Sequence, residues 1–156
     1  MIALKLISIV ILAYLIGAIP FGVIVAKLSR GVDVRDYGSG KSGATNVMRT
    51  AGRKAGIIVM VLDIAKAVVA VILAGIIFSN SRIMLGGFAL DVRFAQALAA
   101  LAAIVGHSWP VYLKFRGGRG VTTFFGGLLI LYPPAALFGS EVWLATSGLT
   151  RYMSLG

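Results

Sequence analysis

The chain has 156 residues, of which 59% are hydrophobic and 13% are charged. A soluble domain averages about 45–50% apolar and about 25% charged residues, so this composition excludes an ordinary soluble domain and a disordered chain. The formal net charge is +10 and there are no cysteines, which excludes disulfides and thiolate chemistry. Because the basic residues lie between long apolar runs, we expect them to meet anionic lipid or phosphorylated substrates, and no nucleic acid.

About five apolar segments are expected to enter the membrane as helices. A transmembrane helix needs about 20 mainly apolar residues, and residues 6–25 supply such a run without a charge. We expect Gly17 and Pro20 to bend the lower half of this run. The other expected segments are residues 55–78, 94–113, 121–138 and a fifth that begins near residue 142.

These segments predict an all-α integral membrane protein, a polytopic helical bundle with a single domain over residues 1–156. The segment that begins near residue 142 is too short for the roughly 30 Å hydrocarbon core of a bilayer. We therefore expect the chain to end within an unfinished element, in preference to a natural re-entrant end.

The basic residues predict the orientation of the bundle. Ten of them fall in two connections, residues 26–54 and 114–120, and three fall on the other side, at Lys5, Arg82 and Arg93. Connections rich in Lys and Arg stay in the cytoplasm. The N-terminus is therefore expected outside, and both glycine-rich connections are expected on the cytoplasmic face.

The first of these connections contains the sequence GSGKSGATNVMR at residues 38–49. Its GSGKS portion resembles the end of a P-loop, but that motif needs glycine at the position of Arg35 and a preceding strand. A nucleotide-hydrolysis site is therefore not expected. Glycine-rich backbone can still point successive N–H groups into a concavity that binds phosphate. The alternative is a solvated basic loop that anchors to lipid headgroups.

Polar and basic side chains flank these glycines. Ser39, Thr45 and Asn46 supply short donors, and Arg49 supplies charge and a bidentate fork. A helix that begins at residue 44 or 45 and leads into the second span would also favour an anion at its N-terminus. The residues of this loop that we predict to bind a phosphate are Gly38, Gly40, Gly43, Thr45 and Asn46.

A second glycine-rich segment, GHSWPVYLKFRGGRG, follows the third apolar run. It contains His107, Gly117 and Gly118 together with Arg116 and Arg119. Two such loops on one face suggest a site for two anionic groups. The alternative for the arginines is positive-inside anchoring. With one histidine and five carboxylates in the chain, no metal site is expected.

Asp63 and Lys66 lie within the second apolar run, three residues apart and on one helix face. Charged residues inside a membrane are costly and are usually paired or functional. Two interpretations stay open. Either the two side chains pair with each other, or Lys66 reaches back to the cytoplasmic phosphate site.

Four stretches resemble the bacterial acyl-phosphate:glycerol-3-phosphate acyltransferases, and the resemblance covers essentially the whole chain. They are GSGKSGATNVMRTAG at 38–52, DIAKA at 63–67, GHSWPVYLKFRGGRGVTT at 106–123 and TRYMSL at 150–155. The resemblance implies a seven-span enzyme of the bacterial inner membrane with a cytoplasmic-side active site. Such an enzyme transfers the acyl group of acyl phosphate to the 1-hydroxyl of glycerol 3-phosphate for phospholipid synthesis, without a cofactor. The products are lysophosphatidic acid and phosphate. The implied partners are the two substrates and the bilayer. The basic loops are also consistent with recruitment of a soluble enzyme that produces acyl phosphate.

The resemblance also implies roles for single residues. Positions 39, 45, 46 and 49 fall in the family's first phosphate-binding motif, and Lys66 falls on the lysine of its second helix. The second motif contains His107, Arg116 and Arg119, with arginine where many members have lysine. Ser154 falls on the serine of the third motif. We therefore predict catalytic roles for Ser39, Arg49, Arg116 and Ser154. Further predicted phosphate ligands are Lys66, His107, Gly117, Gly118 and Arg119.

The chain departs from the family pattern in two places. Lys41 stands where the family commonly has asparagine, so the first loop is more basic than usual. Family members also continue for a few dozen residues, through two more spans and a segment with a histidine and an asparagine of the active site. The chain is expected to correspond to about the first three-quarters of such an enzyme.

The reaction expected is a direct transfer without an acyl-enzyme, because the only histidine is His107 and no Ser-His-Asp order is evident. A phosphate oxygen of the substrate would accept the hydroxyl proton. Ser39 as a covalent nucleophile is the alternative. On the residues alone, two other classes stay open: an organic-anion transporter that uses Asp63 and Lys66, and a non-catalytic membrane protein that binds anionic lipid.

Overall fold

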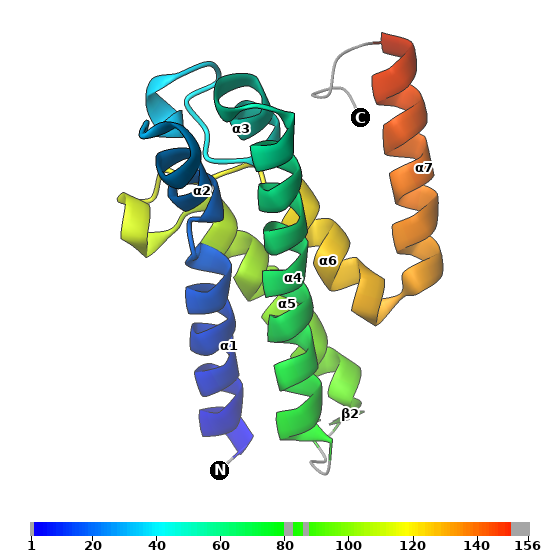
Figure 1. Ribbon diagram of the computed structural model, residues 1–156. Coiled ribbons are helices and arrows are strands. Elements are labelled where there is room, and N and C mark those ends of the chain that lie inside the picture. The colour runs from blue at the N-terminus through cyan, green and yellow to red at the C-terminus, as the bar shows by residue number, and fades with distance from the viewer. Residues whose placement is uncertain (1, 80–82, 86–87, 151–156) are drawn as a thin grey trace.

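The computed structural model describes residues 2–79, 83–85 and 88–150. Three helices, α1 (Ile2–Ala18), α4 (Arg53–Phe78) and α5 (Val92–Ser108), pack against one another as the main bundle (Figure 1). Predominantly helical structure confirms the predicted fold class. The other elements are α2 (Phe21–Arg30), η1 (Val34–Asp36), α3 (Ala44–Ala51), β1 (Ile83–Leu85), β2 (Phe88–Leu90), η2 (Val111–Leu113), α6 (Val121–Leu131) and α7 (Pro133–Thr150).

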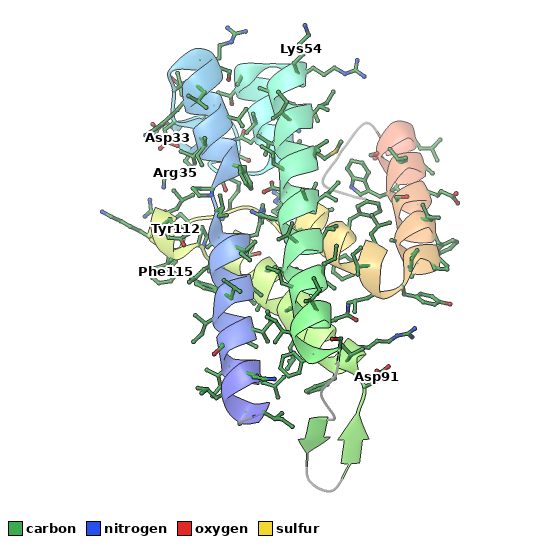
Figure 2. All side chains as sticks on the ribbon, turned by 60° about the horizontal axis from the view of Figure 1, so that its bottom comes forward. Asp33, Arg35, Lys54, Asp91, Tyr112 and Phe115 are labelled. Atoms are coloured by element: carbon green, nitrogen blue, oxygen red, sulfur yellow. The ribbon has the colours of Figure 1, made fainter. Side chains whose placement is uncertain are left out.

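Two short strands, which the helical prediction did not include, connect α4 to α5. β1 and β2 pair as an antiparallel hairpin, with Ile83 opposite Leu90 and Leu85 opposite Phe88. The hairpin lies at the same end of the bundle as the N-terminus, away from α2 and α3 (Figures 1 and 2). It is therefore remote from both glycine-rich loops.

Prolines end two of the expected helices. The first apolar run divides at Pro20 into α1 and α2, which confirms the expected bend. The third helix ends at Ser108, earlier than expected, because Trp109 precedes Pro110 and takes φ −128° and ψ 66°. A residue before proline disfavours the α-helical region.

The predicted boundary between the fourth and fifth segments was wrong. α6 ends at Leu131 and α7 begins at Pro133, with Tyr132 between them at φ −155°. Tyr132 precedes a proline, which disfavours its helical conformation, and Pro133 suits the first position of a new helix because it needs no N–H partner there. Apolar composition continues across this break, so hydropathy alone does not reveal it.

Three stretches are long and apolar enough to cross a membrane. They are Ile2–Arg30 with 29 residues, Arg53–Phe78 with 26 and Val92–Leu113 with 22, and Val121–Leu131 is a shorter apolar helix. These helices support integral membrane character, while the total of about five segments and the orientation stay predictions. Large apolar side chains are exposed along α1 and α4, which suits contact with lipid. Examples are Ile7, Ile11, Ile58, Val61 and Ile76.

Small residues bring the main helices into close contact. A Cβ at Gly17 of α1 would collide with the backbone of Ala103 on α5, and one at Gly106 of α5 would collide with the carbonyl of Tyr14. Membrane helices associate through such small-residue faces. A buried apolar cluster joins α2, η1, α3, the start of α4 and η2. These elements flank both glycine-rich loops, so the cluster holds the two loops at the same end of the bundle. Members of this cluster are Val23, Ala26, Val34, Val47, Val59 and Leu113.

Candidate active site

The first glycine-rich loop, residues 38–43, connects η1 to α3. Gly38 and Gly40 adopt φ values of +56° and +66°, a left-handed conformation that glycine adopts without a steric penalty. A Cβ at Gly38 would in addition collide with the side-chain oxygen of Asn46. The backbone conformation of the loop therefore favours glycine at positions 38 and 40.

Asn46 supports this loop from beneath. Its Oδ1 accepts a hydrogen bond from the Ser39 N–H at 3.1 Å, and the residue is 3% exposed. Its Nδ2 lies 2.9 Å from each of the carbonyl oxygens of Val34, Tyr37 and Lys41, which share its two N–H donors. Both polar atoms of the Asn46 side chain are thus engaged with the loop backbone. We predicted Asn46 as a phosphate ligand. In the structure its side chain instead forms hydrogen bonds to the backbone of the loop.

The helix expected after the loop is present as α3. It begins at Ala44, as predicted, with Gly43 as its N-cap. It does not continue into the second span, because Gly52 at φ +97° separates α3 from α4. Ser39 lies in the loop and is exposed, and Thr45 is half-buried in the first turn of α3, directly after the loop.

An open cleft of about 510 Å³ lies beside the first loop. Arg30 at the end of α2 and Arg49 in the last turn of α3 both border it. Two guanidinium-bearing side chains at one hollow favour an anionic ligand. The sequence singled out Gly38 and Arg49 here and missed the other lining residues. Those residues are Arg30, Val32, Tyr37 and Thr50.

An ion pair stabilises the segment that leads into the loop. A guanidinium nitrogen of Arg35 lies 2.7 Å from Asp33 Oδ2, and both residues lie on the outer side of this region (Figure 2). The hydrogen bond from the Arg35 side chain lowers the pKa of Asp33 from 3.8 to about 2. The same hydrogen bond raises the pKa of Arg35. The Asp33 carboxylate also caps η1 by accepting from the Arg35 backbone N–H.

The second glycine-rich loop, residues 109–120, follows α5 and folds back on itself. Lys114 and Phe115 take φ values of +51° and +61°, which are uncommon for non-glycine residues and are found where the surroundings fix the backbone. Tyr112 and Phe115 project from its outer side (Figure 2). The backbone N–H groups of Phe115, Gly117 and Gly118 donate to the carbonyls of Pro110, Ser108 and His107, respectively.

The predicted phosphate residues of this loop divide into two groups. Gly117 and Gly118 are buried, and a Cβ at Gly118 would collide with the His107 ring. Arg116 and Arg119 are exposed, so their side chains are accessible to a ligand or to lipid headgroups. The glycines therefore shape the loop while the arginines carry its accessible charge.

Asp63, Lys66 and His107 meet beneath the second loop. Lys66 Nζ lies 2.7 Å from Asp63 Oδ1 and 3.1 Å from His107 Nδ1, and it donates to the Ile19 carbonyl at 3.1 Å. The three residues are 1%, 5% and 6% exposed, respectively. The pairing interpretation of Asp63 and Lys66 is thus confirmed, and the phosphate contact of Lys66 stays a prediction.

The two loops converge around this buried group. Ser42 of the first loop and Pro110 of the second border the same narrow hollow as Lys66 and His107, and the hollow is too small for a water molecule. The structure therefore brings Lys66 and His107 next to the base of the first loop. Ser154 lies outside the described residues.

Comparisons with known proteins agree on one family. The family model described as glycerol-3-phosphate acyltransferase matches residues 7–156. Glycerol-3-phosphate acyltransferase 3 of Dehalococcoides mccartyi (strain ATCC BAA-2266 / KCTC 15142 / 195) is 51% identical over 156 residues, which are 100% of this chain and 72% of that protein. Glycerol-3-phosphate acyltransferase of Desulforamulus reducens is 42% identical over the same shares of the two chains.

Solved structures give the same answer. The crystal structure of an integral membrane glycerol 3-phosphate acyltransferase, in its glycerol 3-phosphate form, superposes with a TM-score of 0.82 at 38% identity. The match covers 97% of this chain and 70% of that one. Its lysophosphatidic acid form superposes with a TM-score of 0.80. Sequence identity, matched length and helical architecture all lead to one conclusion: the chain belongs to the glycerol-3-phosphate acyltransferase family of integral membrane enzymes.

Proposed function

We propose that the chain, as one acyltransferase domain, transfers the acyl group of acyl phosphate to the 1-hydroxyl of glycerol 3-phosphate. The observation that carries this proposal is the match over 97% of the chain to an acyltransferase solved in its glycerol 3-phosphate form. The solved lysophosphatidic acid form of the same enzyme supports the expected product. Family membership favours this activity over an anion transporter or a lipid-binding adaptor.

The arrangement of charge suits two phosphorylated substrates. Bringing two phosphate groups together is repulsive, so several cations and backbone N–H donors are needed. Arg49 beside the first loop and Arg116 and Arg119 on the second carry accessible positive charge. The acyl tail of the donor would lie along the exposed apolar helix faces, within the bilayer.

The chemistry follows from a good leaving group. The 1-hydroxyl oxygen attacks the acyl carbonyl carbon, a new C–O ester bond forms, and the bond from that carbon to the phosphate oxygen breaks. The hydroxyl proton passes to a phosphate oxygen of a substrate. Arg49 and Arg116 neutralise charge on the phosphates, Ser39 donates a hydrogen bond at the first loop, and Ser154 contributes from the C-terminal segment. Positioning and charge neutralisation then supply most of the rate acceleration.

The proposed reaction takes place at the cytoplasmic face of a bacterial inner membrane. The asymmetric distribution of Lys and Arg in the sequence supports this orientation. Glycerol 3-phosphate is soluble and would reach the basic loops from the cytoplasm. A soluble enzyme that produces acyl phosphate would dock at the same basic face, which the exposed Arg53 and Lys54 support.

Product formation tests the proposal directly. The chain in lipid nanodiscs would receive palmitoyl phosphate and radiolabelled glycerol 3-phosphate, with palmitoyl-CoA as the control donor. We expect labelled lysophosphatidic acid and phosphate in equal amounts, no product from the control donor, and a large loss of rate in Ser39→Ala. A folded wild-type chain that forms no labelled lysophosphatidic acid from palmitoyl phosphate would contradict the proposal.

A further inference from the structure

Three ionisable side chains from α4 and α5 form a buried group beneath the second loop, here termed the Lys66 cluster (Asp63, Lys66 and His107). Buried charged groups are costly unless they are paired and hydrogen-bonded. Asp63 Oδ1 lies 2.7 Å from Lys66 Nζ and 3.5 Å from His107 Nδ1, and we predict both of these residues to bind substrate. The reaction described above gives Asp63 no task, although its carboxylate is among the most deeply buried charges of the described chain.

The hydrogen bonds of Lys66 are fully used within the protein. A lysine ammonium has three N–H donors and no acceptor. The structure supplies three acceptors: Asp63 Oδ1 at 2.7 Å, His107 Nδ1 at 3.1 Å and the Ile19 carbonyl at 3.1 Å. The Ile19 carbonyl lies at the break in the first apolar run, where Pro20 interrupts the helical hydrogen bonds. Lys66 has no N–H left for a substrate in this arrangement.

This arrangement determines which nitrogen of His107 carries the proton. His107 Nδ1 lies closer to the Lys66 ammonium, at 3.1 Å, than to Asp63 Oδ1, at 3.5 Å, and an ammonium can only donate. Because Nδ1 accepts from Lys66, the ring proton must be on Nε2. A Cβ at Gly118 would collide with His107 Nε2, so this edge of the ring faces the buried backbone of the second loop. The Nε2–H group is therefore presented toward that loop.

We propose that Asp63 and Lys66 are positioning residues that hold His107 as its Nε2–H tautomer, with that edge of the ring packed against Gly118, so that the second loop keeps the shape in which it binds a substrate phosphate. Asp63 makes the shortest of the three contacts of the Lys66 ammonium and so holds it in place. The ammonium in turn keeps His107 Nδ1 as a hydrogen-bond acceptor. The inference rests on the proposed function for the identity of the phosphate. The tautomer itself is independent of any substrate.

The single histidine of the chain makes the tautomer directly measurable. With ¹⁵N-labelled histidine, one imidazole contributes two ring nitrogen signals, and their shifts report which nitrogen carries the proton. We expect a protonated Nε2 and an unprotonated Nδ1 in the wild-type chain without substrate. A proton on Nδ1, on both nitrogens, or exchanging between them would overturn the proposal, whatever the result of the product assay.

Paired substitutions separate positioning from simple charge pairing. Lys66→Met alone leaves Asp63 as an uncompensated buried charge, whereas Asp63→Leu/Lys66→Met removes both charges and is expected to fold. If the pair only balances charge, the double variant should keep wild-type kinetics. We expect instead that the double variant loses the single tautomer and raises KM for glycerol 3-phosphate by about tenfold, with a smaller change in kcat.

The control for this experiment is Thr123→Val. Thr123 is fully buried on α6, which packs against α4, and its hydroxyl has no hydrogen-bond partner among the described residues. The substitution removes one buried hydroxyl of the same interior and leaves the three side chains of the Lys66 cluster unchanged, so tautomer and KM should match the wild type. A folded double variant with the tautomer and KM of the control would overturn the proposal. If the wild type forms no product, the proposed function fails, and the tautomer signals still decide the positioning role.

Discussion

The two glycine-rich loops each depend on one buried polar side chain, but these supports differ in range. Asn46 contacts backbone groups of Val34 to Lys41 that lie 5 to 12 residues away. His107 contacts Lys66, 41 residues away, and Lys66 contacts Ile19 a further 47 residues away. The first loop is therefore shaped by its own segment, and the second by the assembled bundle. Local sequence can encode the first loop, whereas the second requires that three helices have packed.

The largest expected effect concerns the support of the first loop. Asn46→Asp keeps the shape of the side chain and the acceptor for the Ser39 N–H, but it replaces the donor to three carbonyls by a charged oxygen. Each buried polar group left without a partner costs about 1–3 kcal/mol. We expect a fall of several kcal/mol in the free energy of unfolding and loss of product formation.

Thermal unfolding in detergent and the product assay would measure this effect. Ser42→Ala, at a buried position of the same loop, provides a comparison that leaves the hydrogen bonds of Asn46 in place. Wild-type stability and turnover in Asn46→Asp would show that the loop does not depend on this side chain.

A smaller effect is expected from the backbone of the same loop. Gly38→Ala places a Cβ at φ +56° and against Asn46 Oδ1, and a left-handed conformation alone costs a non-glycine residue about 1–2 kcal/mol. Gly43→Ala is the matched control, because φ at this position is −78° and no described atom lies within 4 Å of its Cβ. We expect a lower melting temperature only for Gly38→Ala, and equal losses in both variants would contradict the strain argument.

The smallest effect is expected from the ion pair that precedes the first loop. Arg35 lowers the folded-state pKa of Asp33 from 3.8 to about 2, so the folded state binds fewer protons than the unfolded state between these values. The stabilisation is therefore present above pH 3.8 and is lost as pH falls through about 2. Both side chains are partly exposed, so the effect is modest.

Melting temperatures of the wild type and Asp33→Asn would test this pH dependence. We expect the wild type to be the more stable at about pH 5, with the difference disappearing toward pH 2. A difference that is constant across this range would show that the charge of Asp33 does not contribute to stability.

The sequence predicts the parts of the fold that depend on local pattern. Long apolar runs reveal the three membrane-length helices, Pro20 reveals the break in the first run, and the glycines reveal the first loop. The spacing of Asp63 and Lys66 makes their pairing one of two alternatives. Each of these features rests on residues that are close in sequence.

Features that depend on packing were not predictable in the same way. Asn46 carries the same polar groups whether it faces a ligand or the loop backbone, and only the folded structure shows that it faces inward. Arg30 joins Arg49 at one cleft because α2 and α3 pack together. The division at Tyr132 was missed because apolar residues continue on both sides of it, although the two following prolines are its sequence signal.

The central claim is that both loops hold the phosphate groups of the substrates, and one kinetic comparison tests it most directly. The values of kcat/KM for both substrates would be measured in Arg49→Met, from the first loop, and Arg116→Met, from the second. Arg53→Met is the matched control, because Arg53 is exposed at the start of α4 and carries the same charge. We predict a loss of at least about tenfold in each loop variant, as expected for a charge-assisted hydrogen bond, and little change in the control. Equal kcat/KM values in all three variants would contradict the claim.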